Sequence, residues 1–229
     1  MDLAAQIASI PMFEGLDASQ HANLARIALE KEFSKGEVIF SEGEDAAGLY
    51  AVSIGRVKIY KLSREGKEQI LHLFGPGESF GEVPVFAGGR FPAYAEALEP
   101  TRVLFFPRQA FVDLVKRDSS LALNMLADLS RRLRRFTSLI EDLSLKEVPG
   151  RLAAHLLYLS SRQGESDDLV LDLSKTQLAS LLGTIPETLS RILARMAREG
   201  YIELRNNRQI RILDRESLEL LASGETRLS

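Results

Sequence analysis

The chain contains 229 residues, of which 45% are hydrophobic and 27% are charged, and its formal net charge is −3. This length and composition predict a globular protein of about two domains. The absence of cysteine excludes disulfides, zinc–thiolate sites and cysteine-ligated iron–sulfur clusters. Because the sequence also has neither a signal peptide nor an apolar run of about 18 residues, we expect a cytoplasmic protein with no membrane partner.

Residues 1–117 are expected to form an antiparallel β-roll. A possible N-cap at Asp17 predicts a helix near the start of this segment. Short runs rich in β-branched and aromatic residues follow, such as Val57–Tyr60 and Arg102–Phe106, and glycines separate them. Short, closely spaced strands of this kind are typical of a barrel or jelly roll and not of βαβ units.

A long helix is predicted for residues 118–145. Its apolar residues recur at alternating spacings of three and four, which is the pattern of a coiled-coil seam. A stripe this narrow could pack on the β-domain, but pairing with the same stripe of a second chain is the more common arrangement. We therefore expect a parallel homodimer whose interface contains Leu126, Leu129, Leu133, Phe136, Ile140 and Leu143.

Residues 146–229 are expected to form a separate domain, because Pro149 and Gly150 disfavour a helix interior and so mark a boundary. Ser174–Gln177 has the form of a capping box, which predicts a short helix that Gly183 ends. Thr184–Glu187 repeats this form and predicts a second helix. Two helices joined by a tight glycine turn make a helix-turn-helix.

The second of these helices has the layout of a DNA-recognition helix. One face is apolar, and the opposite face carries hydrogen-bonding side chains that suit base edges in the major groove. A β-hairpin wing is predicted for residues 201–213, and residues 186–211 contain six arginines against three glutamates, a local basic excess. The predicted DNA contacts are Glu187, Thr188, Ser190, Arg191, Arg195 and Arg208, although Glu187 could instead only close a capping box.

The sequence resembles the Crp/Fnr superfamily of bacterial transcription regulators over essentially its whole length. Lys35–Glu44, Gly55–Tyr60 and Pro76–Glu82 resemble its cyclic-nucleotide-binding type of β-roll, and Leu182–Arg191 resembles its recognition helix. The resemblance implies an α+β fold in which a β-roll sensor domain (1–117), a dimerisation helix (118–145) and a winged helix-turn-helix (146–229) follow one another. It also implies a homodimer that reads an inverted repeat in double-stranded DNA and contacts RNA polymerase.

Two residues of the recognition helix point to the DNA sequence. Family members that read TGTGA half-sites carry an arginine where this chain has Pro186 and a glycine where it has Ser190. The Glu-x-x-Ser-Arg string resembles that of members reading TTGA-type half-sites, so we expect a TTGA-type inverted repeat.

The resemblance also implies an effector pocket, with Gly81, Glu82, Arg90, Phe136 and Thr137 as candidate lining residues. Members that bind cyclic AMP hold its phosphate with an Arg-Ser pair, where this chain has phenylalanine and proline; Arg90 lies one residue out of register. A buried cyclic phosphate needs a counter-charge, so cyclic AMP is not expected to be the effector.

The effector is therefore left unknown. Leu143–Lys146 together with Gly150–Ala153 resembles the nitric-oxide and nitrosative-stress branch, the regulators of dissimilatory nitrate respiration and of the hybrid-cluster protein, some of which use haem. His21 and His72 are candidate axial ligands, although a lone histidine is more often a surface or strand residue. We expect the effector to shift the dimer helix and the hinge at residues 146–150, which would reorient the recognition helices.

Three other functions are alternatives to this interpretation. An enzyme is disfavoured, because the sequence shows no paired nucleophile and base, metal cluster or phosphate-binding glycine loop. A ligand-binding module that acts on a protein partner is disfavoured by the complete helix-turn-helix and wing. A constitutive regulator with a vestigial pocket remains open.

Overall fold

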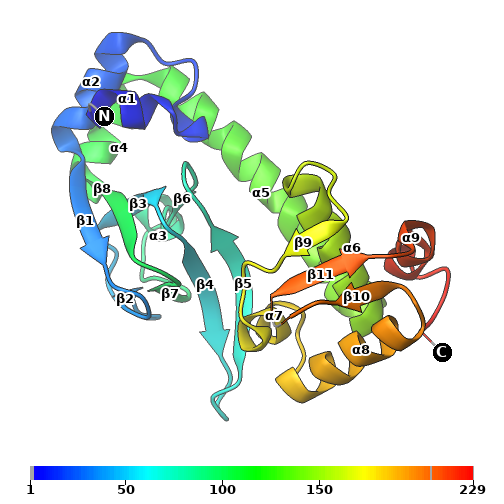
Figure 1. Ribbon diagram of the computed structural model, residues 1–229. Helices are drawn as coiled ribbons and strands as arrows, with labels where there is room; N and C mark the ends of the chain where they lie inside the picture. Colours follow the sequence, from blue (N-terminus) through cyan, green and yellow to red (C-terminus); the bar gives the residue numbers. More distant parts are fainter. Residues whose placement is uncertain (1–2, 207, 229) are drawn as a thin grey trace. The chain divides into compact units, whose positions relative to one another are not determined.

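The computed structural model describes residues 3–206 and 208–228, without the side chains of Arg135 and Ser138 (Figure 1). The chain divides into two compact units, Met1–Arg134 and Arg135–Ser229. The division falls inside the longest helix, α5 (Ser119–Leu145). None of the helices among the described residues has both the length and the apolar content that a membrane span requires.

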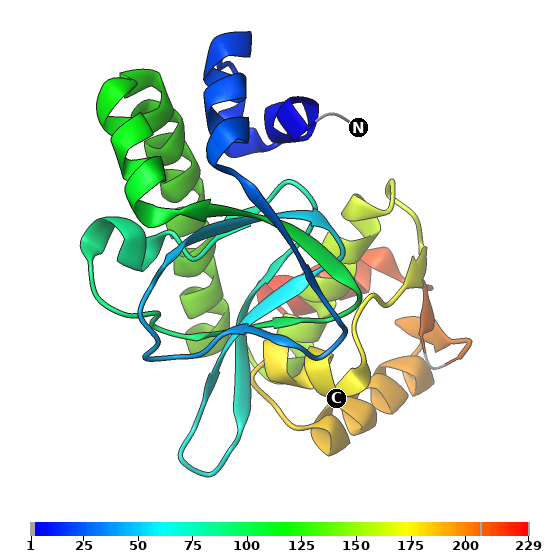
Figure 2. The ribbon, with the colours of Figure 1, turned by 90° about the vertical axis from the view of Figure 1, so that its left-hand side faces the viewer.

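The first unit contains the β-roll that the sequence predicted, with two four-stranded antiparallel sheets wound about each other (Figure 2). The first sheet has the order β1 (Leu29–Phe33), β8 (Thr101–Pro107), β3 (Gly48–Ile54) and β6 (Ser79–Phe80). The second has the order β2 (Val38–Phe40), β7 (Tyr94–Ala97), β4 (Val57–Leu62) and β5 (Glu68–Phe74).

Short helices cover one end of the roll. They are α1 (Leu3–Ala8), η1 (Pro11–Phe13), α2 (Ala18–Ile27) and α4 (Arg108–Arg117), with α3 (Val83–Ala87) between the strands. Asp17 is the N-cap of α2, as predicted, and its carboxylate accepts from the backbone N–H of Gln20, 2.8 Å away. Phe13, Phe106 and Phe111 form the centre of the core beneath these helices. The helical cap and the strands therefore share one hydrophobic core.

Helix α5 uses two different rows of side chains. Leu121 and Met125, which are 2% and 4% exposed, lie in the core of the first unit. The predicted seam is a separate row: Leu126, Leu133 and Ile140 are each at least 60% exposed. Phe136 is also exposed, whereas Leu129 and Leu143 are half-buried. The side of α5 that packs on the first unit is thus the side carrying Leu121 and Met125.

The second unit has the winged helix-turn-helix fold that the sequence predicted. Its helices are α6 (Val148–Arg162), α7 (Lys175–Leu181), α8 (Pro186–Arg198) and α9 (Arg215–Ser223). Its antiparallel sheet has the order β10 (Ile202–Leu204), β11 (Gln209–Ile212) and β9 (Asp168–Val170). Gln163 closes the outer edge of β9, because its side-chain amide donates to the carbonyl oxygen of Val170 and accepts from its N–H, at 2.9 and 3.0 Å.

The predicted interruption at residues 146–150 is shorter than expected. Helix α5 ends at Leu145 and α6 begins at Val148, so Pro149 and Gly150 lie in the first turn of α6. Proline is tolerated there because the first N–H groups of a helix have no intrahelical partner. A Cβ at Gly150 would lie 2.9 Å from the carbonyl oxygen of Leu221 in α9, so this glycine permits close packing of two helices.

The two predicted capping boxes have different outcomes. Ser174 forms its box: its hydroxyl accepts from the N–H of Gln177, and the Gln177 side chain accepts from the N–H of Ser174. The box predicted at Thr184 is wrong, because Ile185 is the N-cap of α8 and no side chain caps it. The N–H of Thr184 instead donates to the carbonyl oxygen of Ala179, which fixes the turn around Gly183.

We expect Ser174→Ala to lower the free energy of unfolding by about 1 kcal/mol, since a backbone N–H at the start of α7 loses its side-chain acceptor. Thr184→Ala is the matched control and should change it by less than about 0.5 kcal/mol, because this side chain caps no helix. Urea unfolding followed by circular dichroism measures both values. Equal losses in the two variants would contradict this assignment.

His155, which has a buried ring nitrogen, is expected to make the stability of the protein depend on pH. The Nε2 of His155 on α6 is buried and has no hydrogen-bond partner among the described residues. Burial lowers the pKa of His155 below its ordinary value of 6.5, and the negative charge of Asp172 opposes this shift in part. The unfolded chain therefore binds a proton at His155 more readily than the folded chain does.

The contribution of His155 to the free energy of unfolding should consequently be fully present above about pH 6.5. It should fall as the pH is lowered through that value, by at most about 1.4 kcal/mol per pH unit. His155→Gln should remove this contribution. Thermal unfolding of both proteins between pH 5 and 8 tests it. Identical slopes for the wild type and the variant would rule His155 out as the cause.

Candidate functional site

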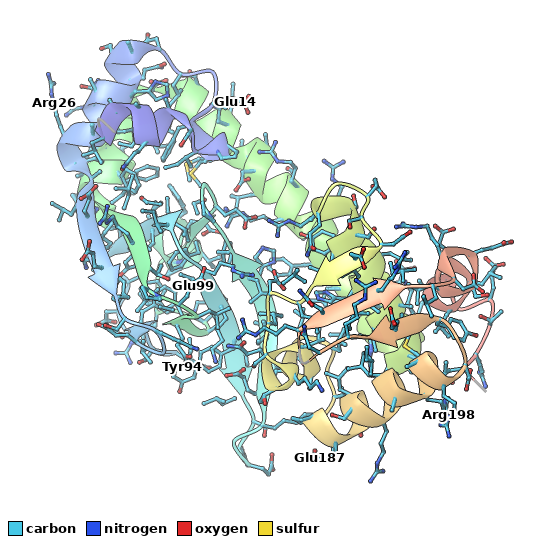
Figure 3. All side chains as sticks on the ribbon, in the orientation of Figure 1. Glu14, Arg26, Tyr94, Glu99, Glu187 and Arg198 are labelled. Carbon is cyan, nitrogen blue, oxygen red and sulfur yellow. The ribbon has the colours of Figure 1, made fainter. Side chains whose placement is uncertain are left out.

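Helix α8 carries polar side chains on the face opposite its buried stripe. Leu189, Leu193 and Met196 are at most 2% exposed and fix the helix to the domain. Glu187, Ser190, Arg191 and Arg198 are exposed and Thr188 is half-buried. Figure 3 shows Glu187 in the first turn of this helix and Arg198 in its last turn. The exposed face can therefore offer carboxylate, hydroxyl and guanidinium groups to a groove of duplex DNA.

Arg195, on the same helix, has partners within the domain. Its Nη2 donates to the carbonyl oxygen of Leu228, 2.8 Å away, and its Nε lies 3.8 Å from Glu199 Oε1. Leu228 is itself buried. Arg195 thus holds the segment that follows α9 against the recognition helix.

The wing places Arg208 in an exposed turn. The Asn206 Oδ1 accepts from the backbone N–H groups of Arg208 and Gln209 at 2.8 and 2.9 Å, which orders the turn between β10 and β11. The other wing arginines are paired with carboxylates: Arg205 with Asp168 and Glu203, and Arg211 with Asp168. Within residues 3–206 and 208–228, no carboxylate pairs with Arg191, Arg198 or Arg208. These three cations are therefore available to an anionic partner.

The structure adds one cation that the sequence analysis missed. Lys175 is exposed in the first turn of α7, and no acidic side chain in the described segments pairs with it. It lines a depression of about 200 Å³ together with Leu171, Leu193, Leu204, Asn206 and Ile210. This depression links α7 to α8 and the wing. The sequence could have indicated Lys175 as a phosphate contact, because it directly follows the Ser174 N-cap. In the first turn of a helix, the backbone N–H groups and a cation can bind a phosphate together.

In the first unit, the predicted pocket residue Glu82 forms a buried ion pair with Arg132 of α5. The Arg132 Nη1 lies 3.0 Å from Glu82 Oε1, and its Nη2 donates to Ser79 Oγ at 2.7 Å. The Nη2 also lies 2.7 Å from Asp128 Oδ2. Two carboxylates therefore share one guanidinium. Neither Arg132 nor Asp128 was among the predicted pocket residues, because the contact of Arg132 with Glu82 joins residues 50 positions apart in the chain.

Aromatic rings fill the interior of the β-roll. Phe91 is 3% exposed and stacks on Phe40 with 3.7 Å between ring centroids. Tyr50 stacks on Phe80 at 5.2 Å, and burial followed by the charge of Glu44 raises the pKa of Tyr50 to about 12. A Cβ at Gly81 would lie 3.3 to 3.4 Å from three of these rings, and this glycine has φ +78°. Glycine at position 81 lets the backbone approach the rings closely.

The other candidate effector residues do not join Glu82 in the first unit. Arg90 is exposed and its Nε lies 3.1 Å from Asp45 Oδ1. Phe136 and Thr137 are exposed and belong to the second unit. The structure thus brings Gly81 and Glu82 together with Ser79, Asp128 and Arg132.

The two candidate haem ligands lie in different elements. His21 is in α2, and its Nε2 lies 3.0 Å from the carbonyl oxygen of Phe13. His72 is in β5, with its ring against the edge of Phe74. Among the described residues, no three histidine, aspartate or glutamate side chains are grouped as a metal site would require.

Comparison with known proteins places both units in one family. Residues 30–118 match the cyclic nucleotide-binding domain family, and residues 150–221 match the Crp-like helix-turn-helix domain family. The CRP-like cAMP-activated global transcriptional regulator of Mycobacterium tuberculosis is 32% identical over 216 residues, which cover 93% of this chain and 96% of that protein. The chain belongs to the Crp/Fnr family of transcription regulators.

Two further similarities connect this Crp/Fnr regulator to other members. The fumarate and nitrate reduction regulatory protein of Escherichia coli is 30% identical over 207 residues, 88% of this chain and 81% of that protein. The structure of FixK2 from Bradyrhizobium japonicum has a TM-score of 0.75 at 29% identity and covers 85% of this chain and 97% of its own. These relatives confirm the prediction of a DNA-binding transcription regulator and not an enzyme.

Proposed function

We propose that this Crp/Fnr regulator binds a TTGA-type inverted repeat as a homodimer and places one α8 helix in each major groove. The observation that carries the proposal is the exposed polar face of α8, opposite a stripe that is almost fully buried. A helix anchored in this way presents its first turns to base edges. The dimer presents two such helices to the two halves of the repeat.

The side chains of α8 suit a guanine–cytosine pair in each half-site. Arg191 can donate both arms of its guanidinium to guanine O6 and N7, and Glu187 can accept from cytosine N4. Thr188 and Ser190 supply hydroxyl groups beside them. Arg208 on the wing suits a phosphate. Arg195 has one of its N–H groups bonded to the Leu228 carbonyl oxygen, which leaves fewer donors for a phosphate contact.

The seam of α5 supports a parallel dimer. Leu126, Leu133 and Ile140 recur at intervals of seven residues and are exposed in the single chain, which is what a coiled-coil partner would cover. Crp/Fnr regulators act as dimers, which agrees with this use of the stripe. The proposed interface also includes Leu129, Phe136 and Leu143.

In the proposed organisation, residues 1–117 form the sensor domain, 118–145 the dimerisation helix and 146–229 the DNA-binding domain. An effector bound in the sensor domain shifts α5 and the hinge predicted at residues 146–150, in which Lys146 and Glu147 connect α5 to α6. RNA polymerase is the proposed protein partner at the promoter. A cytoplasmic location is part of the proposal, because the proposed partner is DNA.

For the effector, we propose a molecule other than cyclic AMP. By the sequence resemblance, Phe91 stands at the position of the phosphate-binding arginine, and its ring lies inside the aromatic stack. The buried Arg132 is shared by Glu82 and Asp128, so it lacks an uncompensated positive charge for a phosphate. A role in nitrosative-stress or nitrate-respiration control, with haem or a small organic effector, follows from the sequence resemblance alone. An absorption spectrum of protein from its native host distinguishes haem by its Soret band.

A constitutive regulator with a vestigial pocket is the second candidate function, because the stacked rings already fill the interior of the β-roll. A module that acts only on a protein partner is less well supported, since the whole DNA-binding domain is present.

Fluorescence anisotropy with labelled duplexes tests the DNA sequence proposed. We expect the protein to bind an inverted repeat of TTGA half-sites, with centres about one helical turn apart, at least about tenfold more tightly than one of TGTGA half-sites. The same duplex with scrambled half-sites is the control at each salt concentration. Preference for TGTGA would overturn the proposed reading by α8.

A further inference from the structure

The outer face of the wing sheet carries two arginines and two carboxylates. Asp168 in β9 lies opposite Arg211 in β11, and Arg211 lies opposite Glu203 in β10. Arg205 follows β10 on the same face. Leu169 and Ile210, which alternate with these residues, are buried against the domain. The four charged side chains therefore form one solvent-facing group.

Asp168 holds both arginines of this group. The Arg205 Nη1 lies 2.8 Å from Asp168 Oδ1, and its Nε lies 3.1 Å from Glu203 Oε2. The Arg211 Nε lies 3.9 Å from the same Asp168 oxygen. Each of the four side chains is between 40% and 58% exposed. Exposed ion pairs of this kind add little to stability, so stability alone does not account for the arrangement.

The position of the group gives it a second consequence. Arg205 and Arg208 flank the turn of the wing, and Arg208 has no acidic partner in the described part of the chain. DNA phosphates attract both cations, but a phosphate can bind the Nη1 of Arg205 only in competition with Asp168, while Glu203 holds the Nε. A carboxylate and a phosphate both accept from the same guanidinium N–H groups, so the two compete directly.

We infer that Asp168 is an internal competitor of the DNA backbone for Arg205, and that it limits the affinity of the wing for any duplex. The inference rests on the proposed contact of the wing with DNA. It concerns phosphate contacts, which contribute to all sequences alike, and leaves the base contacts of α8 unchanged. Asp168 therefore raises the share of the binding free energy that depends on the operator sequence.

Asp168→Asn tests this inference, because it removes the charge and keeps the shape of the side chain. In the full-length protein at about 0.1 M salt, we expect both the operator and a scrambled duplex to bind roughly 3- to 10-fold more tightly. The ratio of the two affinities should not change. The slope of log Kd against log salt should steepen by about one for each wing that gains a phosphate contact.

Asp167→Asn is the matched control. Asp167 is the preceding residue, is similarly exposed and pairs with Arg215 of α9 instead of a wing arginine, at 2.8 Å. It undergoes the same change of charge and should alter affinity less than about twofold. A second background, Arg205→Ala, should remove most of the gain from Asp168→Asn, since Arg205 is the closer of the two arginines that Asp168 holds. Unchanged melting temperatures confirm that the variants fold.

Three results would overturn the inference: equal gains from Asp167→Asn and Asp168→Asn, a gain that is equally large in the Arg205→Ala background, or no gain at all. If the wild type still prefers the operator over the scrambled duplex in these experiments, the proposed function stands while the inference fails. A wild-type protein without that preference overturns the proposed reading of TTGA half-sites as well.

Discussion

Replacing Arg191 with alanine is expected to weaken binding to the preferred operator by about 30-fold or more. One bidentate contact to a base contributes about 1 to 3 kcal/mol of discrimination, and a dimer loses two such contacts. Arg191 is exposed in the second turn of α8 and free of ion pairs throughout the described residues, so nothing within the domain compensates for its loss. Fluorescence anisotropy with operator and scrambled duplexes measures both affinities.

Arg198→Ala provides the matched control for this experiment. Arg198 lies on the same helix and is also exposed, but it is in the last turn (Figure 3). Its replacement by alanine removes the same charge. We expect it to weaken both duplexes by a similar and smaller factor, because it can reach only the backbone. If Arg191→Ala lowered both affinities equally, Arg191 would be a phosphate contact and the assignment of α8 as the base-reading element would be wrong.

Introducing a charge into the α5 seam should have an effect of similar size. Leu133 is 68% exposed in the single chain, and in the proposed dimer it lies in the centre of the interface. Leu133→Glu removes apolar burial and brings two like charges together across the seam. We expect monomers at micromolar concentration in sedimentation velocity, and a loss of about 100-fold or more in operator affinity, because the two half-sites are then bound independently.

Leu123→Glu serves as the comparison for the seam variant. Leu123 is 65% exposed on the same helix but lies outside the heptad stripe. It should leave both the dimer and its operator affinity nearly unchanged. A dimer that survives Leu133→Glu but dissociates with Leu123→Glu would mean that a different face of α5 pairs the chains.

Sequence periodicity predicted the parts of the fold that depend on local signals. The strands of the roll, the N-cap at Asp17, the box at Ser174 and the turn at Gly183 all require only neighbouring residues. The capping box predicted at Thr184 does not form, although the sequence matches the capping-box pattern. There, the Thr184 N–H bonds to Ala179 and Pro186 starts the helix, so the tertiary arrangement of the turn decides the cap.

The contacts that join distant segments could not be predicted in the same way. Arg132 follows the heptad pattern as a non-seam residue, yet it reaches Glu82, 50 residues earlier in the chain. The pairing of Arg205 with Asp168 likewise depends on the register of β9 against β11. The sequence showed a basic segment over residues 186–211. Only the ion pairs in the structure reveal which of its arginines are neutralised by carboxylates.

Gln163, at the β9 edge of the three-stranded sheet, limits how one DNA-binding domain can associate with another molecule. A strand from another molecule can extend a sheet only where backbone N–H and C=O groups face outward. At Val170 both groups already bond to the amide of Gln163. Intermolecular β-pairing, a common first step toward aggregation, is therefore disfavoured at Val170.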